Sequence, residues 1–119
     1  MTIQVNNNYG LIEIDEQVIA SVAGMSAMEC YGIVGMASKS ASEGFFQLLN
    51  VEQLSRGIRV NTNEENEVSI DLHIFLQYGV KISVVAENII SKVKYSIETL
   101  IGMKVKDVKV FVEGVRVQN

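Results

Sequence analysis

The sequence predicts an α+β domain, in which helices pack on one face of a small, mainly antiparallel sheet. Two stretches carry apolar residues at helical spacing, one beginning near Val18 and one near Ile82. Between them, residues 68–76 alternate apolar and polar side chains with a period of two, which is typical of a strand. The predicted order is strand, helix, strand, strand, long helix, strand, with a further short helix expected after the first helix.

The N-terminal third predicts one strand followed by one helix. Residues 10–14 alternate in polarity and predict a short strand with one buried face. Asp15 is a residue type that caps helix N-termini, and the helix after it runs to about residue 30. Gly32 then ends the helix, since glycine adopts positive φ without strain.

The middle of the chain has weaker patterns. Residues 32–44 are small and polar after Met36, so we interpret them as a connection. Apolar residues between positions 45 and 49 predict a short helix that ends before Gly57. Two apolar alternations around a polar loop then predict a β-hairpin over residues 58–76, with one face on the core.

The C-terminal third contains the clearest helix of the chain, which is closed by Gly102. Its apolar stripe follows the i, i+3 and i+4 spacing of an amphipathic helix. The stripe consists of Ile82, Val85, Ala86, Ile89, Val93, Ile97 and Leu100. A final strand begins near Val108, and its alternation changes phase near Gly114, as a β-bulge would produce.

Length and composition indicate one cytoplasmic domain over residues 1–119, with residues 1–8 as an arm that could be flexible. The sequence has no proline-rich linker, no signal peptide and no apolar run near the ~20 residues of a membrane-spanning helix, so we expect no direct membrane insertion. The single cysteine, Cys30, suits a reducing compartment.

Charge is unevenly distributed along the chain. The net charge is −4 and the sequence pI is about 4.9, which argues against nonspecific nucleic-acid binding. Residues 1–80 hold ten acidic and three basic side chains, whereas residues 81–119 hold four and seven. This asymmetry could favour head-to-tail self-association or contact with an anionic surface, although two ordinary solvated faces are the simpler interpretation.

Candidate catalytic and metal-binding groups are few. Ser69, Asp71 and His73 are triad residue types, but alternate residues of one strand stand ~6.6 Å apart. A nucleophile must lie within roughly 3 Å of its base, so this geometry excludes a triad. Cys30 and His73 are the only Cys–His pair, and Cys30 falls on the apolar stripe of the first helix. With one histidine and one cysteine, we predict no enzyme activity, no metal and no cofactor.

An alternative is a nucleic-acid-binding module of the KH type. Gly32-Ile33-Val34-Gly35 resembles the Gly-x-x-Gly loop that clamps a nucleotide backbone between two helices in KH domains. The two middle residues are aliphatic, and no basic cluster lies near them in the sequence. Because phosphate binding needs local positive charge, this alternative is disfavoured but stays open.

A further pattern favours an interaction protein. If the alternating aliphatic residues face the helices, a mixed set of aromatic and charged residues shares the opposite face of the sheet. The predicted partner interface is Arg59, His73, Phe75, Lys109 and Phe111, with Leu11 and Asp71 on the same face. Aromatic residues and arginine are enriched in protein contacts, so we expect self-association or partner binding there. The alternative is that a loop or the N-terminal arm covers this face.

Several motifs follow one another along almost the whole chain. They are Tyr9-Gly10-Leu11-Ile12-Glu13-Ile14, Val18-Ile19-Ala20, Tyr31-Gly32-Ile33-Val34-Gly35-Met36, Val68-Ser69-Ile70-Asp71-Leu72, Gln77-Tyr78-Gly79 and Gly102-Met103-Lys104-Val105. In order and spacing they are similar to the alkaline shock protein family of Gram-positive bacteria, also called the Gls-type envelope stress response family.

The resemblance implies a cytoplasmic protein without enzymatic activity, associated with envelope stress and membrane homeostasis. It implies protein partners, including a membrane-anchored protein or an enzyme of lipid metabolism, because short members are often encoded beside a kinase subunit of the dihydroxyacetone or fatty-acid type. A regulatory subunit of such an enzyme is therefore a second open alternative. The long polar terminal extensions of the stress-induced members are absent from this sequence.

Overall fold

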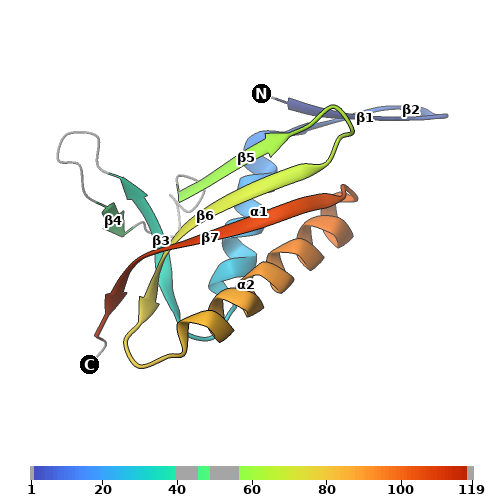
Figure 1. The fold of residues 1–119 in the computed structure, drawn as a ribbon. Helices are drawn as coiled ribbons and strands as arrows, with labels where there is room; N and C mark the ends of the chain where they lie inside the picture. Colours follow the sequence, from blue (N-terminus) through green and yellow to red (C-terminus); the bar gives the residue numbers. More distant parts are fainter. Residues whose placement is uncertain (1, 40–45, 49–56, 118–119) are drawn as a thin grey trace.

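The computed structural model describes residues 2–39, 46–48 and 57–117. Its main body is a five-stranded, mainly antiparallel sheet with helices on one face, which confirms the α+β class (Figure 1). The elements are β1 (Thr2–Asn7), β2 (Gly10–Asp15), α1 (Glu16–Met28), β3 (Ile33–Lys39), β4 (Phe46–Leu48), β5 (Ile58–Thr62), β6 (Val68–Gln77), α2 (Ile82–Ser96), the π-helical turn η2 (Ile97–Ile101) and β7 (Val105–Arg116).

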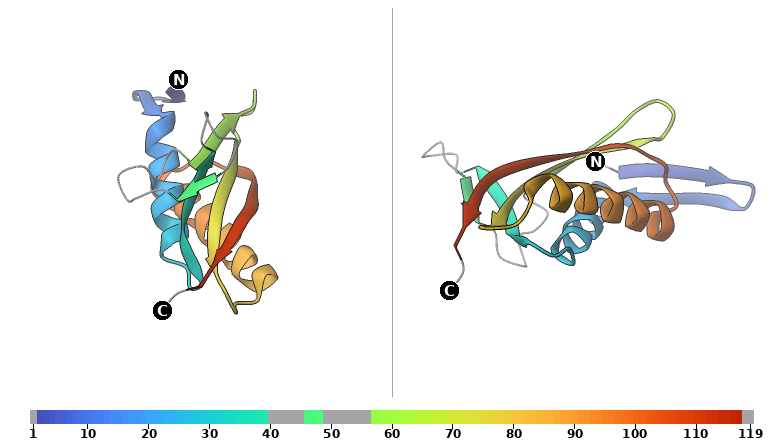
Figure 2. Two further views of the ribbon diagram at one scale, coloured as in Figure 1. Left: turned by 90° about the vertical axis from the view of Figure 1, so that its left-hand side faces the viewer. Right: turned by 60° about the horizontal axis from the view of Figure 1, so that its bottom comes forward.

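Strand β6 is the centre of the sheet. On one edge it pairs antiparallel with β5 and, further along, with β3, which in turn pairs with β4. On its other edge β6 pairs in parallel with β7 along its whole length. Helix α2 makes the crossover that a parallel neighbour requires, so β7 becomes the outer strand beside β6 (Figure 2).

The period of two in β6 separates a core face from a face without helices. Its core-facing residues are Val68, Ile70, Leu72, Ile74 and Leu76, all with no exposed surface. They pack with Ile19 and Ala23 of α1 and with Ile89 and Val93 of α2. The opposite face carries no helix in the described part of the chain, and we call it the helix-free face.

Both helices begin and end near the predicted residues. The side chain of Asp15 accepts a hydrogen bond from the Gln17 amide at 2.8 Å and caps α1. The C-terminal turn of the long helix is a π-helix, closed by Gly102 in the left-handed conformation with φ of 82°. Because a π turn holds one extra residue, Leu100 is rotated outward and is 72% exposed, which corrects its predicted place in the buried stripe.

Two predictions for the middle of the chain were wrong. Residues 33–39, predicted as a connection, form β3, and residues 46–48, within the predicted short helix, form β4. Pairing with β6 stabilises β3, and β3 in turn stabilises β4; such tertiary pairing outweighs local composition. The other positions of the predicted short helix lie outside the described residues.

The predicted first strand has a different partner from the one expected. It pairs with β1 as a separate hairpin, which extends from the N-terminal end of α1 away from the five-stranded sheet (Figure 1). Residues 2–7 of the expected arm are therefore a strand. Leu11, 51% exposed, belongs to this hairpin and not to the helix-free face, because alternation predicts a strand but not its partner.

Candidate contact surface on the helix-free face

The predicted interface residues come from three neighbouring strands. In the register of the sheet, Arg59 of β5 and Lys109 of β7 both oppose Asp71 of β6. The next position along β6, His73, opposes Phe111 of β7. Four of the five residues predicted for the interface therefore form two adjacent rows on this face, and Arg59 and Lys109 are exposed.

A bulge in β7 organises the centre of this face. The register between β6 and β7 shifts after the pair of Ile74 and Val112, which confirms the predicted change of phase near Gly114. The extra residue is Glu113, whose Oε1 lies 3.0 Å from Nδ1 of His73. The imidazole also stacks on Phe111, with 4.8 Å between ring centroids and 14° between planes.

Phe75 lies on the predicted face but is not available to a partner. Its side chain is only 4% exposed, because β7 covers it after the bulge. A Cβ atom at Gly114 would come within 2.9 Å of the Phe75 ring, so only glycine fits above it. The guanidinium carbon of Arg116 stands 4.6 Å from the ring centroid, in a cation–π contact. The contact role predicted for Phe75 is therefore corrected to a structural one.

Glu113 and Arg116 are the members of this surface that the sequence prediction missed. Regular alternation from Val108 would bury the even-numbered residues against the helices, yet Arg116 reaches the helix-free face. The phase change near Gly114 was the available signal. Applied to each side of the glycine, it places both residues on the helix-free face.

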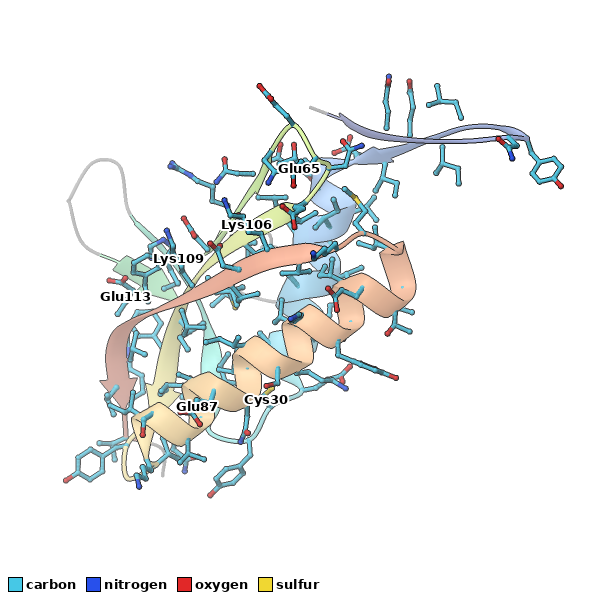
Figure 3. The ribbon with its side chains drawn as sticks, turned by 45° about the vertical axis from the view of Figure 1, so that its right-hand side comes forward. Cys30, Glu65, Glu87, Lys106, Lys109 and Glu113 are labelled. Carbon is cyan, nitrogen blue, oxygen red and sulfur yellow. The ribbon has the colours of Figure 1, made fainter. Side chains whose placement is uncertain are left out.

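The surface does not assemble the triad residue types into a reactive centre. His73 contacts Glu113 and Phe111, and Ser69 stands four residues away along the same strand, beyond the reach of a nucleophile and its base. Cys30 lies in the helix layer (Figure 3), near the carbonyl oxygens of Ser26 and Asn88, whereas His73 lies on the helix-free face beside Glu113. Burial raises the pKa of its thiol, with a partly opposing effect of the nearby Lys92.

The Gly-x-x-Gly segment does not have the KH arrangement. Gly32 has a φ of 92° and makes the turn after α1, but Ile33 already begins β3. Gly35 opposes Phe75 inside the sheet. The prediction of a loop between two helices is therefore wrong, since the second element is a strand.

A recess lies on the helix side of the molecule, between α1 and the C-terminal part of α2. It has a volume of about 370 Å³, and the exposed side chains of Met25, Tyr95 and Leu100 stand at its rim. An ion pair between Glu29 and Lys92, 3.2 Å apart, borders it. This helix-layer recess is mainly apolar and offers a comparison surface for the experiments below.

The described ranges 2–39, 46–48 and 57–117 offer neither a cluster of metal ligands nor a membrane-spanning helix. These residues contain no group of three or more His, Cys, Asp or Glu side chains placed to hold a metal ion. Within the same ranges, no helix combines the length and the apolar character needed to cross a bilayer.

Comparison with known proteins identifies the family. The profile of the alkaline shock protein 23 family, described as having a cell envelope-related function, matches residues 4–117. The chain is 47% identical to YloU of Bacillus subtilis over 120 residues, which cover 100% of this chain and 99% of that protein. It is 42% identical to Spy1614 of Streptococcus pyogenes, over 98% of this chain and 97% of that protein.

Both relatives are described only as uncharacterized proteins, and no solved structure matches the chain significantly. The family match and the near-complete alignments agree with the motifs quoted from the sequence. The chain belongs to the alkaline shock protein 23 family, whose function is related to the cell envelope.

Proposed function

We propose that this chain is a non-enzymatic accessory protein of the cell envelope, which works in the cytoplasm by binding other proteins through the helix-free face. The observation that carries this proposal is the stack of His73 on Phe111, in which the phenylalanine is 40% exposed next to the charged row of Arg59, Asp71 and Lys109. An aromatic residue held rigid by a neighbour contributes contact area without losing much side-chain entropy on binding, as is typical of interface anchors.

The charges around Phe111 support a protein partner. Lys109 and Arg59 flank Asp71 in one row, and Glu113 borders the aromatic pair, so both signs occur within a few residues. A mixed rim of this kind favours a surface of complementary pattern over a uniformly anionic polymer or bilayer. Any membrane association would then depend on a membrane-anchored partner, as the family resemblance implies.

The test compares copurified proteins in a Gram-positive host. The wild-type chain, Phe111→Ser and the control Tyr31→Ser would each be isolated with a terminal tag and quantified by mass spectrometry. Tyr31 is 82% exposed in the turn after α1, so its replacement removes an exposed aromatic residue elsewhere. We expect envelope-related partners to fall at least tenfold with Phe111→Ser only. An unchanged partner set, or equal losses in both variants, would refute this use of the face.

If an enzyme of lipid metabolism is among the partners that Phe111→Ser loses, this result would favour the alternative that the chain is a regulatory subunit of that enzyme. Binding of RNA by the wild-type chain that weakens with salt would instead favour the nucleic-acid alternative.

A further inference from the structure

The outer edge of β7 is the longest unpaired strand edge in the described part of the chain, since this 12-residue strand pairs only with β6 there (Figure 2). An exposed edge offers backbone N–H and C=O groups that pair readily with another strand. Which residues offer them follows from the hydrogen bonds of β6.

The backbone N–H and C=O groups of successive β6 residues point alternately to its two edges. The Gln77 amide donates to the carbonyl of Gly32 at 2.8 Å, on the β3 side. The Val68 amide donates to the carbonyl of Lys104 at 2.9 Å, on the β7 side. Even-numbered residues of β6 therefore point their backbone groups at β7, because the direction reverses at every residue of a strand.

The outward-facing residues of β7 follow from this alternation. In a parallel ladder, a residue bonds to the two positions that flank its register partner. The register partners of Ile70, Leu72 and Ile74, the even-numbered residues in the middle of β6, are Val108, Val110 and Val112. The backbone groups of these three valines consequently point away from β6, along the outer edge.

We propose that this edge pairs antiparallel with β7 of a second copy of the chain, in the register that places Phe111 opposite Phe111 of the second copy. Val110 of each copy then opposes Val112 of the other, so two residue pairs can exchange backbone hydrogen bonds. The residues of these hydrogen-bonded pairs lie between the two register shifts of β7, at Lys106 and at Glu113, where the strand is regular. The pairing does not require the envelope role proposed above.

Charge complementarity selects this register and the second copy as occupant. With Phe111 on the two-fold axis, Lys109 of each copy comes beside Glu113 of the other, the bulge residue whose carboxylate also contacts His73. Figure 3 shows both side chains on the side of β7 away from α2. Cross-strand pairs of opposite charge stabilise a sheet, whereas like charges in direct opposition destabilise it.

Neighbouring registers lack this match. With Val110 on the axis, Asp107 would oppose Glu113 of the second copy; with Lys109 on the axis, the two lysines would oppose each other. In the selected register, Lys106 and Arg116 lie at or beyond the register shifts of β7, at the ends of the paired segment, where solvent screens like charges.

The pairing would also join the two aromatic stacks. Phe111 of each copy would meet its counterpart at the axis, with His73 stacked behind it. Because only a short segment pairs, we expect a weak dimer that forms at micromolar or higher concentration, as small interfaces generally do.

The test is a charge exchange followed by sedimentation equilibrium between 5 µM and 1 mM. Lys109→Glu and Glu113→Lys, each alone, should weaken self-association at least tenfold, and an equimolar mixture of the two should restore it, because opposite charges then face each other again. The controls Lys94→Glu and Glu87→Lys make the same changes of net charge at exposed positions of α2 and should associate like the wild type. Circular dichroism checks that each variant is folded.

Hydrogen exchange of the wild-type chain gives a measurement that depends on no variant. The amides of Val110 and Val112 should gain protection as concentration rises. The proposal is overturned by a wild-type chain that stays monomeric to 1 mM, by a mixture that fails to associate, or by a dimer lost through Tyr95→Ser in the helix-layer recess. Loss of copurified partners with Phe111→Ser in a monomeric wild type would leave the proposed function standing without this pairing.

Discussion

Replacing Gly114 with alanine should destabilise the helix-free face by forcing apart β7 and the ring beneath it. An added Cβ would lie 2.9 Å from both Cδ1 and Cε1 of Phe75, closer than such atoms approach in proteins. The ring cannot move freely, since it is 4% exposed and has the Arg116 guanidinium on it. One methyl group must therefore displace either the strand or the ring.

The size of the effect can be worked from two opposing contributions. Overpacking a filled site costs about 1–3 kcal/mol. Loss of glycine entropy in the unfolded chain offsets about 0.4–1 kcal/mol. The midpoints of these ranges leave a net loss of about 1.3 kcal/mol. With ~2.1 cal/mol/K per residue, 119 residues have an unfolding entropy of roughly 0.25 kcal/mol/K, so Tm should fall by about 5 °C.

Urea unfolding of a double-mutant cycle provides the assay. Phe75→Leu alone should lower the free energy of unfolding by about 1 kcal/mol. Because this change also removes the ring edge that the new methyl group meets, Gly114→Ala should lower the free energy of unfolding only slightly in the Phe75→Leu background. The control is Gly102→Ala, which is strained by its φ of 82° with no atom within 4 Å, and whose cost should add fully to that of Phe75→Leu. Full additivity for Gly114→Ala, or an unchanged Tm, would refute the reasoning.

Two further predictions concern the helices. Asp15→Ala removes the acceptor for the Gln17 amide and should cost about 1 kcal/mol, or ~4 °C in Tm, whereas Asp15→Asn should keep most of the stability; equal losses would contradict the cap. Cys30 should react with iodoacetamide more slowly than a free peptide thiol at pH 8, because its raised pKa leaves less thiolate, and the rate should climb as the pH rises. Lys92→Gln should slow the reaction further, since the Lys92 charge lowers this pKa; a rate equal to the free thiol would count against burial.

The local sequence determined those features that depend only on residues close together in the chain. The alternation of residues 68–76, the Asp15 cap and the end of the long helix at Gly102 all appear as predicted. Each depends on a period, a hydrogen bond between near neighbours or one backbone conformation. The α+β class and the change of phase near Gly114 could be predicted for the same reason.

Only the tertiary structure decided which strands meet and which side chains remain exposed. Residues 33–39 form a strand because β6 offers an edge for them, and residues 10–15 pair with β1 instead of the main sheet. Phe75 and Phe111 are the same residue type on one face, yet a bulge and a glycine cover the first and leave the second 40% exposed. Burial depends on groups distant in the chain, and no local pattern encodes their approach.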